Sequence, residues 1–390
     1  MPGTVRTRWG LGVLVLAVIA GAAIVVWPEG TAEAGDPEIS VSRSSCGEGW
    51  TDPKPGPQTF RVHNTGSVTA EVYLIDPGNG TIYGELEGLG SGTIRPLRVT
   101  LGNGDYAFKC LPEETSAIIG PTAKITGGDA RSGPAIAPVT NEELLAPLKA
   151  YQAHVTAGLG TLVSDTDALK AAVDRQDRAA SETAWLTAHL SYERLGAAYD
   201  AFGDSDGAIN GTTDGLPDGV ADPGFTGFHR LEYGLWHDEA MDALGAVATQ
   251  LDSDVHTLQQ SFPDAQVDRS DLGLRAHEIM ENALQFEITG RTDYGSGTSL
   301  ATTLANLDGT RAVLDVLRPL LTSRFAGLSD VDSWLDRTRK VLEGARGADG
   351  GWTPVARLTQ PERQKLNGTV AELTERLAPI AAIAEPRRVS

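Results

Sequence analysis

Residues 224–236 read Gly-Phe-Thr-Gly-Phe-His-Arg-Leu-Glu-Tyr-Gly-Leu-Trp, an aromatic stretch that contains an imidazole and a carboxylate three residues apart. On a helix, residues i and i+3 lie on one face, so His229 and Glu232 can point at one atom. Imidazole nitrogen and carboxylate oxygen are common transition-metal ligands, and an unpartnered carboxylate is costly in apolar surroundings. The stretch therefore predicts a helix that carries part of a metal site. The alternative is a half-buried histidine, with Glu232 paired to Arg230 or to solvent.

Three further places carry polar groups that suit such a site. His189 and Glu193 stand four residues apart, as do His277 and Glu281, and Asp293 follows the second pair. Helical bundles can hold metal sites built from inward-pointing Glu and His on several helices. Taken singly, each pair can also be an exposed i,i+4 contact. Glu193 is the more telling residue, because its helix is otherwise apolar.

The chain from residue 140 to 386 is predicted to be an all-α bundle. Thr140 and Glu143 form the T-x-x-E signature of a helix start. Residues 202–225 interrupt the helical pattern, because they are rich in Gly and Asp, and a loop of that length is expected to be ordered by something. Apolar residues recur at helical spacing in the segments 240–262, 272–288, 300–321, 331–342 and 361–383.

The segment 38–127 is predicted to be a small all-β domain. Short alternating apolar runs, such as 59–63 and 71–75, are separated by turn sequences rich in Gly, Asn and Pro. Strands at this spacing are typical of a sandwich or a barrel. Residues 128–139 contain many glycines and prolines, and we interpret them as a linker.

Residues 1–34 are expected to direct export. Two arginines precede an apolar run at 11–27, and Ala-Glu-Ala at 32–34 has the form of a cleavage site. The run is also long enough to remain as an uncleaved anchor. We therefore predict an extracytoplasmic location, in the periplasm or cell envelope or secreted, with the membrane surface as a partner if the segment is retained.

The chain has 390 residues, a formal net charge of −20 and two cysteines. The acidity argues against nucleic acid as a partner, because phosphates would repel it. In an oxidising compartment Cys46 and Cys110 are predicted to form a disulfide. The alternative is that the two thiolates are metal ligands.

The sequence contains neither the zinc-peptidase motifs nor the EF-hand calcium-binding motif. H-E-x-x-H does not occur, and H-x-x-E-H would need a histidine where Tyr233 stands. The Asp-rich fragments 204–207 and 214–219 lack the EF-hand pattern and are predicted to be turns. We therefore expect no catalytic residues.

Taken together, these features resemble the EfeO family, the extracytoplasmic components of EfeUOB-type iron-uptake systems. The resemblance is carried by the order of segments, by Tyr-Glu-Arg at 192–194 and by the stretch 225–236. The helical part is similar to the imelysin-like domain, historically labelled peptidase M75, and the β part resembles a cupredoxin. The resemblance implies an iron-binding protein whose partners are an iron permease and a haem (DyP-type) peroxidase.

The resemblance also implies a ligand set. Two positions depart from the family pattern, because Gly196 stands where a second carboxylate is expected and Asn210 replaces an aspartate. Fewer charges around the cation imply a changed affinity or metal preference. The implied metal ligands are Glu193, His229, Glu232 and Asp293.

In the β domain, a blue-copper centre would need two His, a Cys and a weak axial ligand such as Met. The segment 38–127 has one histidine, His63, and no methionine, which argues against such a centre. The resemblance implies a different second metal site, which would compete with the disulfide for the sulfur atoms. Its ligands would be Cys46, Glu71, Glu85 and Cys110.

The predicted function is binding of iron, as Fe³⁺ or Fe²⁺, in the helical domain and its transfer to a permease. By its position, the segment 202–225 is predicted to gate release. The alternatives are a metal-dependent peptidase, as the family label suggests, and a binding protein for copper or zinc.

Overall fold

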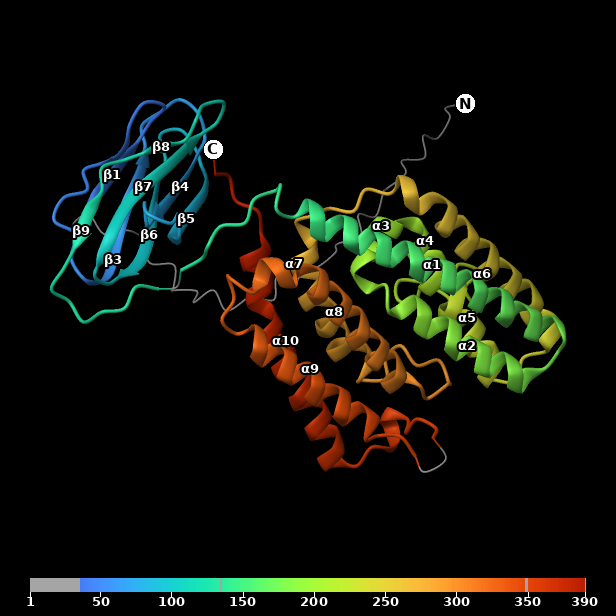
Figure 1. Ribbon diagram of the computed structural model, residues 1–390. Helices are drawn as coiled ribbons and strands as arrows, with labels where there is room; N and C mark the ends of the chain where they lie inside the picture. Colours follow the sequence, from blue (N-terminus) through green and yellow to red (C-terminus); the bar gives the residue numbers. More distant parts are fainter. Residues whose placement is uncertain (1–35, 134, 348–349, 390) are drawn as a thin grey trace, which may run out of the picture.

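The computed structural model describes residues 36–133, 135–347 and 350–389, so the predicted export segment 1–34 lies outside the described residues. Strands occupy the chain from Glu38 to Ile125 and helices from Leu145 to Ala384. The two parts lie beside each other in Figure 1. The prediction of a β domain followed by an all-α domain is confirmed, whereas its exact limits at 127 and 140 stay a prediction.

The β part consists of two sheets with an apolar core between them. Alternation along the strands sends every second side chain inward, so that Phe60 and Phe108 lie in the core and pack edge to face. Trp50, which follows β2, packs edge to face against both rings. The first sheet has the order β2(Cys46–Glu48), β1(Glu38–Val41), β3(Gly56–Asn64) and β6(Ile94–Leu101). The second has the order β5(Ile82–Leu89), β4(Ala70–Ile75), β7(Gly104–Pro112) and β8(Ile118–Ile119), with β9(Ala123–Ile125) also on β7.

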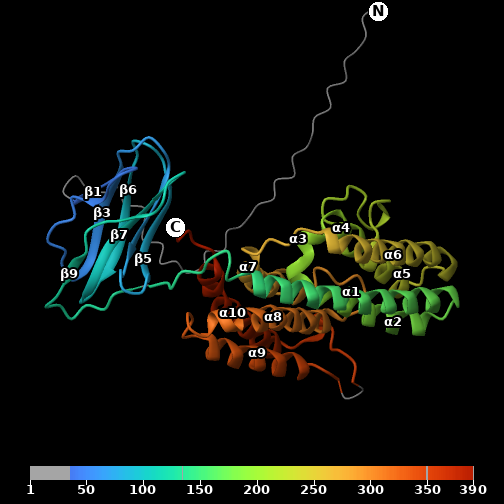
Figure 2. The ribbon, with the colours of Figure 1, turned by 45° about the horizontal axis from the view of Figure 1, so that its top comes forward.

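The helical part is built from long helices that pack along one another, as Figure 2 shows for α1 with α2 and for α8 with α9. Its apolar core is continuous through all the long helices. The helices are α1(Leu145–Asp174), α2(Arg178–Glu193), α3(Tyr199–Phe202), α4(Asp204–Asn210), α5(Gly227–Trp236), α6(Met241–Ser261), α7(Asp271–Asn282), α8(Ser299–Leu321), α9(Leu328–Glu343) and α10(Gln360–Ala384). A π-helical turn, η4(Ala283–Glu287), continues α7.

Two predictions of local structure need correction. The Thr140–Glu143 contacts form, with Thr140 N–H donating to the Glu143 carboxylate at 2.9 Å, but α1 begins only at Leu145 after a turn. The segment 202–225 is not all loop, because it contains α4 and a short 3-10 turn, η2(Gly219–Ala221). Among the described residues, no helix has the length and apolar character needed to cross a membrane.

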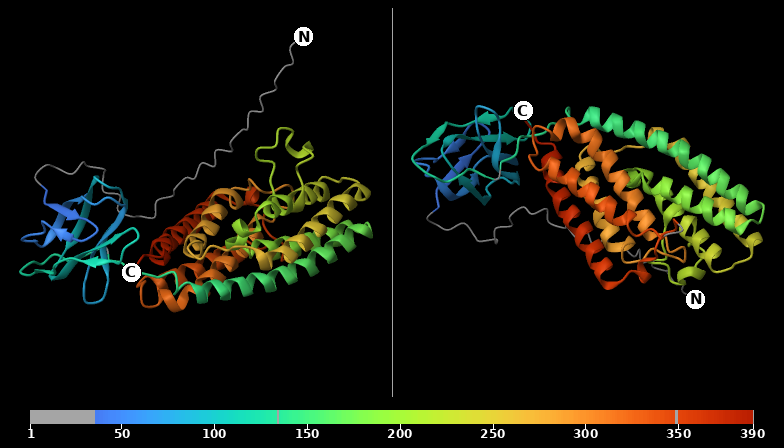
Figure 3. Two further views of the ribbon diagram at one scale, coloured as in Figure 1. Left: turned by 90° about the horizontal axis from the view of Figure 1, so that it is seen from above. Right: turned by 60° about the horizontal axis from the view of Figure 1, so that its bottom comes forward.

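The last residues of the chain leave α10 and lie against the β part, where Figures 1 and 3 place the C-terminus. Arg387 is 3% exposed and donates to both carboxylate oxygens of Glu85, each at 2.9 Å. It also donates to the carbonyls of Ala382 and Glu385. The guanidinium is thus fully engaged between the two parts of the chain.

Two more contacts join the same surfaces. Lys109 on β7 donates to the carbonyl of Val389 at 2.7 Å, and the linker residue Ile136 forms a backbone bridge with Ile82. The linker and the C-terminal tail meet each other where Val139 bridges Pro386. The chain therefore connects the β part and the helical part at two adjacent points.

Candidate metal centre

The helix α5, which carries the H-x-x-E motif, can start only at a glycine. Gly227 has φ +75°, and a Cβ there would lie 2.1 Å from the carbonyl oxygen of Ile209 at the end of α4. This close approach fixes α5 against α4. Trp185 on α2 holds the next residue, because its indole N–H donates to the Phe228 carbonyl at 2.8 Å.

His229 and Glu232 are both buried and contact each other, with Nδ1 of His229 3.2 Å from Oε2 of Glu232. The other oxygen of Glu232 accepts from the N–H of Tyr294 and from the N–H and hydroxyl of Ser296. Burial by itself would raise the pKa of Glu232, but His229 and Ser296 outweigh it and lower that pKa. A carboxylate that occupies one ring nitrogen is typical of a metal-binding histidine, because it leaves the second nitrogen for the ion.

Asp293 shapes the loop that supplies those donors. Its Oδ1 accepts from the N–H groups of Gly295 and Gly297, at 2.9 and 3.0 Å. Burial raises the pKa of Asp293, and the nearby Glu232 adds to this effect. The structure thus places Asp293 and Glu232 close together.

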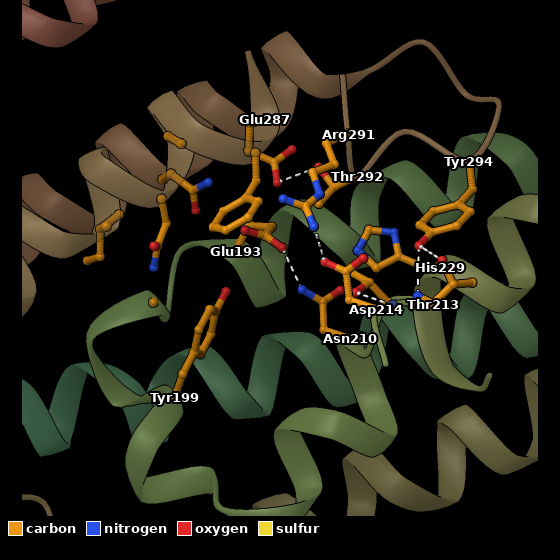
Figure 4. Close-up of a pocket in the computed structure, with 17 residues that line it drawn as sticks. Glu193, Tyr199, Asn210, Thr213, Asp214, His229, Glu287, Arg291, Thr292 and Tyr294 are labelled. Carbon is orange, nitrogen blue, oxygen red and sulfur yellow. Dashed lines mark hydrogen bonds and ion pairs between the residues drawn. The ribbon is translucent and has the colours of Figure 1, made fainter. Parts of the chain in front are cut away.

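A cavity of about 330 Å³ lies between α2, α4, α5 and the η4 turn (Figure 4). Of the four ligands that the resemblance implies, Glu193 and His229 line this cavity, whereas Glu232 and Asp293 are not among its lining residues. The two departures from the family pattern, Gly196 and Asn210, both line it, as do Glu287, Asn306 and Tyr294.

Glu193 is surrounded by donors. Asn210 donates to its Oε1 at 2.8 Å, and His189 Nε2 lies 3.1 Å from the same oxygen. The amide of Asn306, oriented with its nitrogen inward, donates to Oε2 at 2.9 Å. Burial would raise the pKa of Glu193, but His189 and Asn210 outweigh it and lower that pKa. Asn210 therefore supplies a hydrogen bond where the family pattern has a charge.

Glu287 is a cavity residue that the sequence analysis missed. It ends the π-helical turn η4 and accepts a hydrogen bond from the Thr292 hydroxyl at 2.8 Å. Burial, with a contribution from the charge of Glu193, raises its pKa to about 8. Figure 4 shows the carboxylates of Glu193 and Glu287 near each other, with His229 and Asn210 nearby. A carboxylate held this way is suited to a cation, and π turns are frequent at functional sites.

The two predicted i,i+4 pairs differ in their surroundings. His189 is 2% exposed and its ring stacks on Trp185, so the His189–Glu193 pair lies in the interior rather than on the surface. His277 and Glu281 contact each other at 3.7 Å and do not line the cavity. Glu232 is likewise not paired with Arg230, which binds Glu239.

The loop after α4 closes one side of the cavity. The backbone N–H of Thr213 donates to the Tyr294 hydroxyl at 2.9 Å. Asp214 pairs with Arg291 at 2.7 Å, and these two side chains are more than half exposed. The contacts link the predicted gating segment to the segment that follows Glu287.

The second predicted metal site, in the β part, is not assembled. Cys46 and Cys110 form a disulfide that ties β2 to β7 across the core. Glu85 pairs with Tyr73 across the strands, on the face of the second sheet turned away from that core. There Arg387 binds Glu85 and Arg388 contacts Glu71. The sulfur atoms are bonded to each other and the carboxylates are neutralised by arginines, so the four residues do not share an ion.

A different group of potential ligands lies between two long helices. Within the described ranges, one set of three His, Cys, Asp or Glu residues has ligand atoms all within 4.8 Å of one another, and it lies outside the cavity. It consists of Asp167 on α1 with Asp252 and His256 on α6. Burial, together with the contact with Asp167, raises the pKa of Asp252. The group is partly exposed, and it is the rival location for an ion.

Comparison with known proteins agrees with this architecture. The imelysin family, peptidase M75, matches residues 147–380. Over 351 residues the chain is 27% identical to the iron uptake system component EfeO of Escherichia coli K12, and equally to those of Shigella flexneri and Shigella sonnei. Each alignment covers 89% of this chain and 90% of the relative. The match spans most of the helical part, including the H-x-x-E helix and the cavity, and the chain belongs to the imelysin (peptidase M75) family.

Proposed function

We propose that the protein is the extracytoplasmic iron-binding component of an iron-uptake system and that it holds iron in the cavity between α2, α5 and η4. The observation that carries the proposal is that Glu193, Glu287 and His229 line one cavity. The similarity to proteins named as iron uptake components supports the choice of metal. The disulfide is in keeping with an oxidising compartment.

The donor set suits iron. Carboxylate oxygens are hard ligands that offset the charge of a cation, and imidazole suits iron, copper and zinc. In this proposal Glu193 and Glu287 supply oxygen and His229 supplies nitrogen. Glu232 fixes the imidazole, and Asp293 holds the loop that fixes Glu232. The four residues that the resemblance implies thus act together, with two of them facing the ion and two supporting them.

Release would require the cavity to open. The loop that carries Thr213 and Asp214 reaches across to Tyr294 and Arg291 through only a few contacts, one of which, the Asp214–Arg291 pair, is exposed. We propose that this loop is the gate and that the released ion passes to a membrane permease, with a haem peroxidase as the other partner of the system. The predicted export segment would deliver the protein to that location.

The test is metal content after loading. Purified protein would be loaded with Fe²⁺ under anaerobic conditions or with Fe³⁺ citrate, desalted, and analysed for bound metal. We expect one tightly held ion in the wild type and its loss in His229→Gln and in Glu193→Gln/Glu287→Gln. The variant Asp252→Asn/His256→Gln should retain it.

Three results would redirect the proposal. Retention of iron in both cavity variants, with loss in Asp252→Asn/His256→Gln, would move the site to the α1–α6 group. Tighter binding of Cu²⁺ or Zn²⁺ than of iron would change the metal. Metal-dependent cleavage of casein that is lost in Glu232→Gln would favour a peptidase.

A further inference from the structure

The cavity is larger than a single ion requires. Its volume of about 330 Å³ falls within the range of roughly 300–1,000 Å³ that is typical of sites for small organic molecules. The three proposed ligands, Glu193, Glu287 and His229, would also leave positions open on an iron ion, as three protein ligands commonly do. A molecule that enters with the ion would fill both the space and these positions.

An arginine lines this cavity, which is unexpected for a site that holds only a cation. Figure 4 shows Arg291 beside Glu287 and Thr292. Its guanidinium lies 5.4 Å from the centre of the Phe286 ring, and its Nη2 pairs with Asp214 at 2.7 Å. A guanidinium repels a metal ion, but it binds carboxylates well, often through two parallel hydrogen bonds. Arg291 therefore suits an anionic molecule rather than the ion.

The Asp214 carboxylate occupies the place on Arg291 that the carboxylate of such a molecule would take. The side chains of Arg291 and Asp214 are 58% and 63% exposed. Ion pairs at this exposure contribute little stability, so an incoming carboxylate can replace Asp214. Because Asp214 belongs to the loop proposed as the gate, this replacement would also remove one of the contacts that hold the loop closed.

A second polar group in the cavity lacks a partner. The Oδ1 of Asn210 is buried and accepts no hydrogen bond from any residue in the described parts of the chain. The Nδ2 of the same amide is engaged, because it donates to Glu193. Buried acceptors without a donor are rare. The hydroxyl group of a bound molecule would supply the missing donor.

We propose that the cavity takes up iron together with a small hydroxycarboxylate, whose carboxylate groups bind the ion and replace Asp214 on Arg291. This inference rests on the proposed function. Because the cavity already contains the carboxylates of Glu193, Glu287 and Asp214, the anion is expected to bind only with the ion, whose charge attracts it. The competing explanation is that the Asp214–Arg291 pair only fastens the loop.

The test counts iron and anion in the same sample. Purified protein would be loaded with Fe³⁺ and radiolabelled citrate, desalted, and analysed for both. We expect one citrate per iron in the wild type, and no citrate on protein loaded without iron. Arg291→Gln should hold roughly tenfold less citrate per iron, the effect typical of losing a hydrogen bond between charged groups. The matched control is Arg311→Gln, which removes the arginine of another exposed pair, Arg311–Asp336, and should keep one citrate per iron.

The variant Asp214→Asn separates the two explanations. It removes the competing carboxylate, so it should release citrate more slowly than the wild type, whereas a pair that only fastens the loop predicts faster release in both Asp214→Asn and Arg291→Gln. Iron without citrate in the wild type, or faster release from Asp214→Asn, would overturn the inference and leave iron binding intact. Wild-type protein that retains neither iron nor citrate would overturn the proposed function as well. Both side chains are more than half exposed, so neither substitution is expected to prevent folding, which circular dichroism would check.

Discussion

Replacing Glu287 by Gln should make the metal-free protein more stable while it weakens metal binding. Glu287 is partly buried at the end of the η4 turn and close to Glu193, and its pKa is raised from 4.5 to about 8. Between these two pH values the folded protein holds a proton that the unfolded chain has lost. The free energy of unfolding of the wild type therefore falls as pH rises through this window. Glutamine stays neutral and can still accept the hydrogen bond from Thr292.

The size of the effect follows from the two pKa values. At about 1.4 kcal/mol per pH unit, the charge of Glu287 opposes folding by roughly 3 kcal/mol at pH 7 and by roughly 5 kcal/mol above pH 8. Below pH 4.5 the carboxyl group is neutral in both states and contributes nothing. Glu287→Gln should therefore match the wild type below pH 4.5, exceed it increasingly up to about pH 8, and keep that advantage at pH 9.

The assay is urea unfolding in the presence of a chelator at pH 5, 7 and 9. The matched control is Glu375→Gln, an exposed position on α10, which should change stability little at any pH. The reasoning is refuted if Glu287→Gln is no more stable than the wild type at pH 9, or if its advantage does not grow with pH. With the metal present the order should reverse, because a bound cation stabilises only the protein that still offers the carboxylate.

Three further predictions concern the glycine at the start of α5, the disulfide of the β part and the C-terminal tail. Gly227→Ala should lower the free energy of unfolding by more than about 1 kcal/mol, because φ is +75° and the new Cβ meets the Ile209 carbonyl. Thermal unfolding checks this, with Gly368→Ala, an open position on α10, as the control. Equal melting temperatures of the two variants would contradict the prediction. Cys46→Ser/Cys110→Ser should destabilise the β part by about 4 kcal/mol, given a sequence separation of 64 residues. The iron content of the protein should stay unchanged. Loss of iron while the β part is still folded would show that the β part binds a metal. Arg387→Ala should leave Glu85 without its buried partner and weaken the contact between the C-terminal tail and the β part by about 1–3 kcal/mol. The measurement is the rate of proteolysis within residues 128–139, which should rise. An unchanged cleavage rate would show that the tail contributes little to this contact.

Local periodicity is enough to predict the burial and the facing of three of the site residues. The i,i+3 spacing and the apolar neighbours place His229 and Glu232 on one buried helix face, which α5 confirms. The apolar helix around Glu193 likewise predicts its burial, and Glu193 is 5% exposed. Both inferences need only the geometry of a single helix.

The rest of the site depends on features that spacing does not reveal. The π-helical turn changes the helical register after Asn282, so the pattern of α7 does not indicate which way Glu287 points. The donors to Glu232 come from Tyr294 and Ser296, more than 60 residues away. The group of Asp167, Asp252 and His256 depends on how α1 and α6 are aligned against each other. Each of these features depends on the tertiary structure, which residue spacing does not predict.

The short helix α4 was hidden for a different reason. Its sequence, Asp204–Asn210, is rich in the residues that favour turns, yet Ile209 is fully buried and anchors it to the core. Tertiary packing has overridden local preference here.

The linker and the C-terminal tail, which connect the β part and the helical part at two adjacent points, limit how the two parts can be recombined between relatives. A β domain exchanged between relatives at the linker alone would arrive without residues 387–389, whose side chains and carbonyls complete its outer face. In such an exchanged domain Glu71 and Glu85 would lack their arginine partners, and Arg387 of the helical part would lack its carboxylate partner. Recombination should therefore succeed only when both ends of the helical part travel with the matching sheet. The sequences of the sheet and of the C-terminal tail, though some 300 residues apart, are expected to change together.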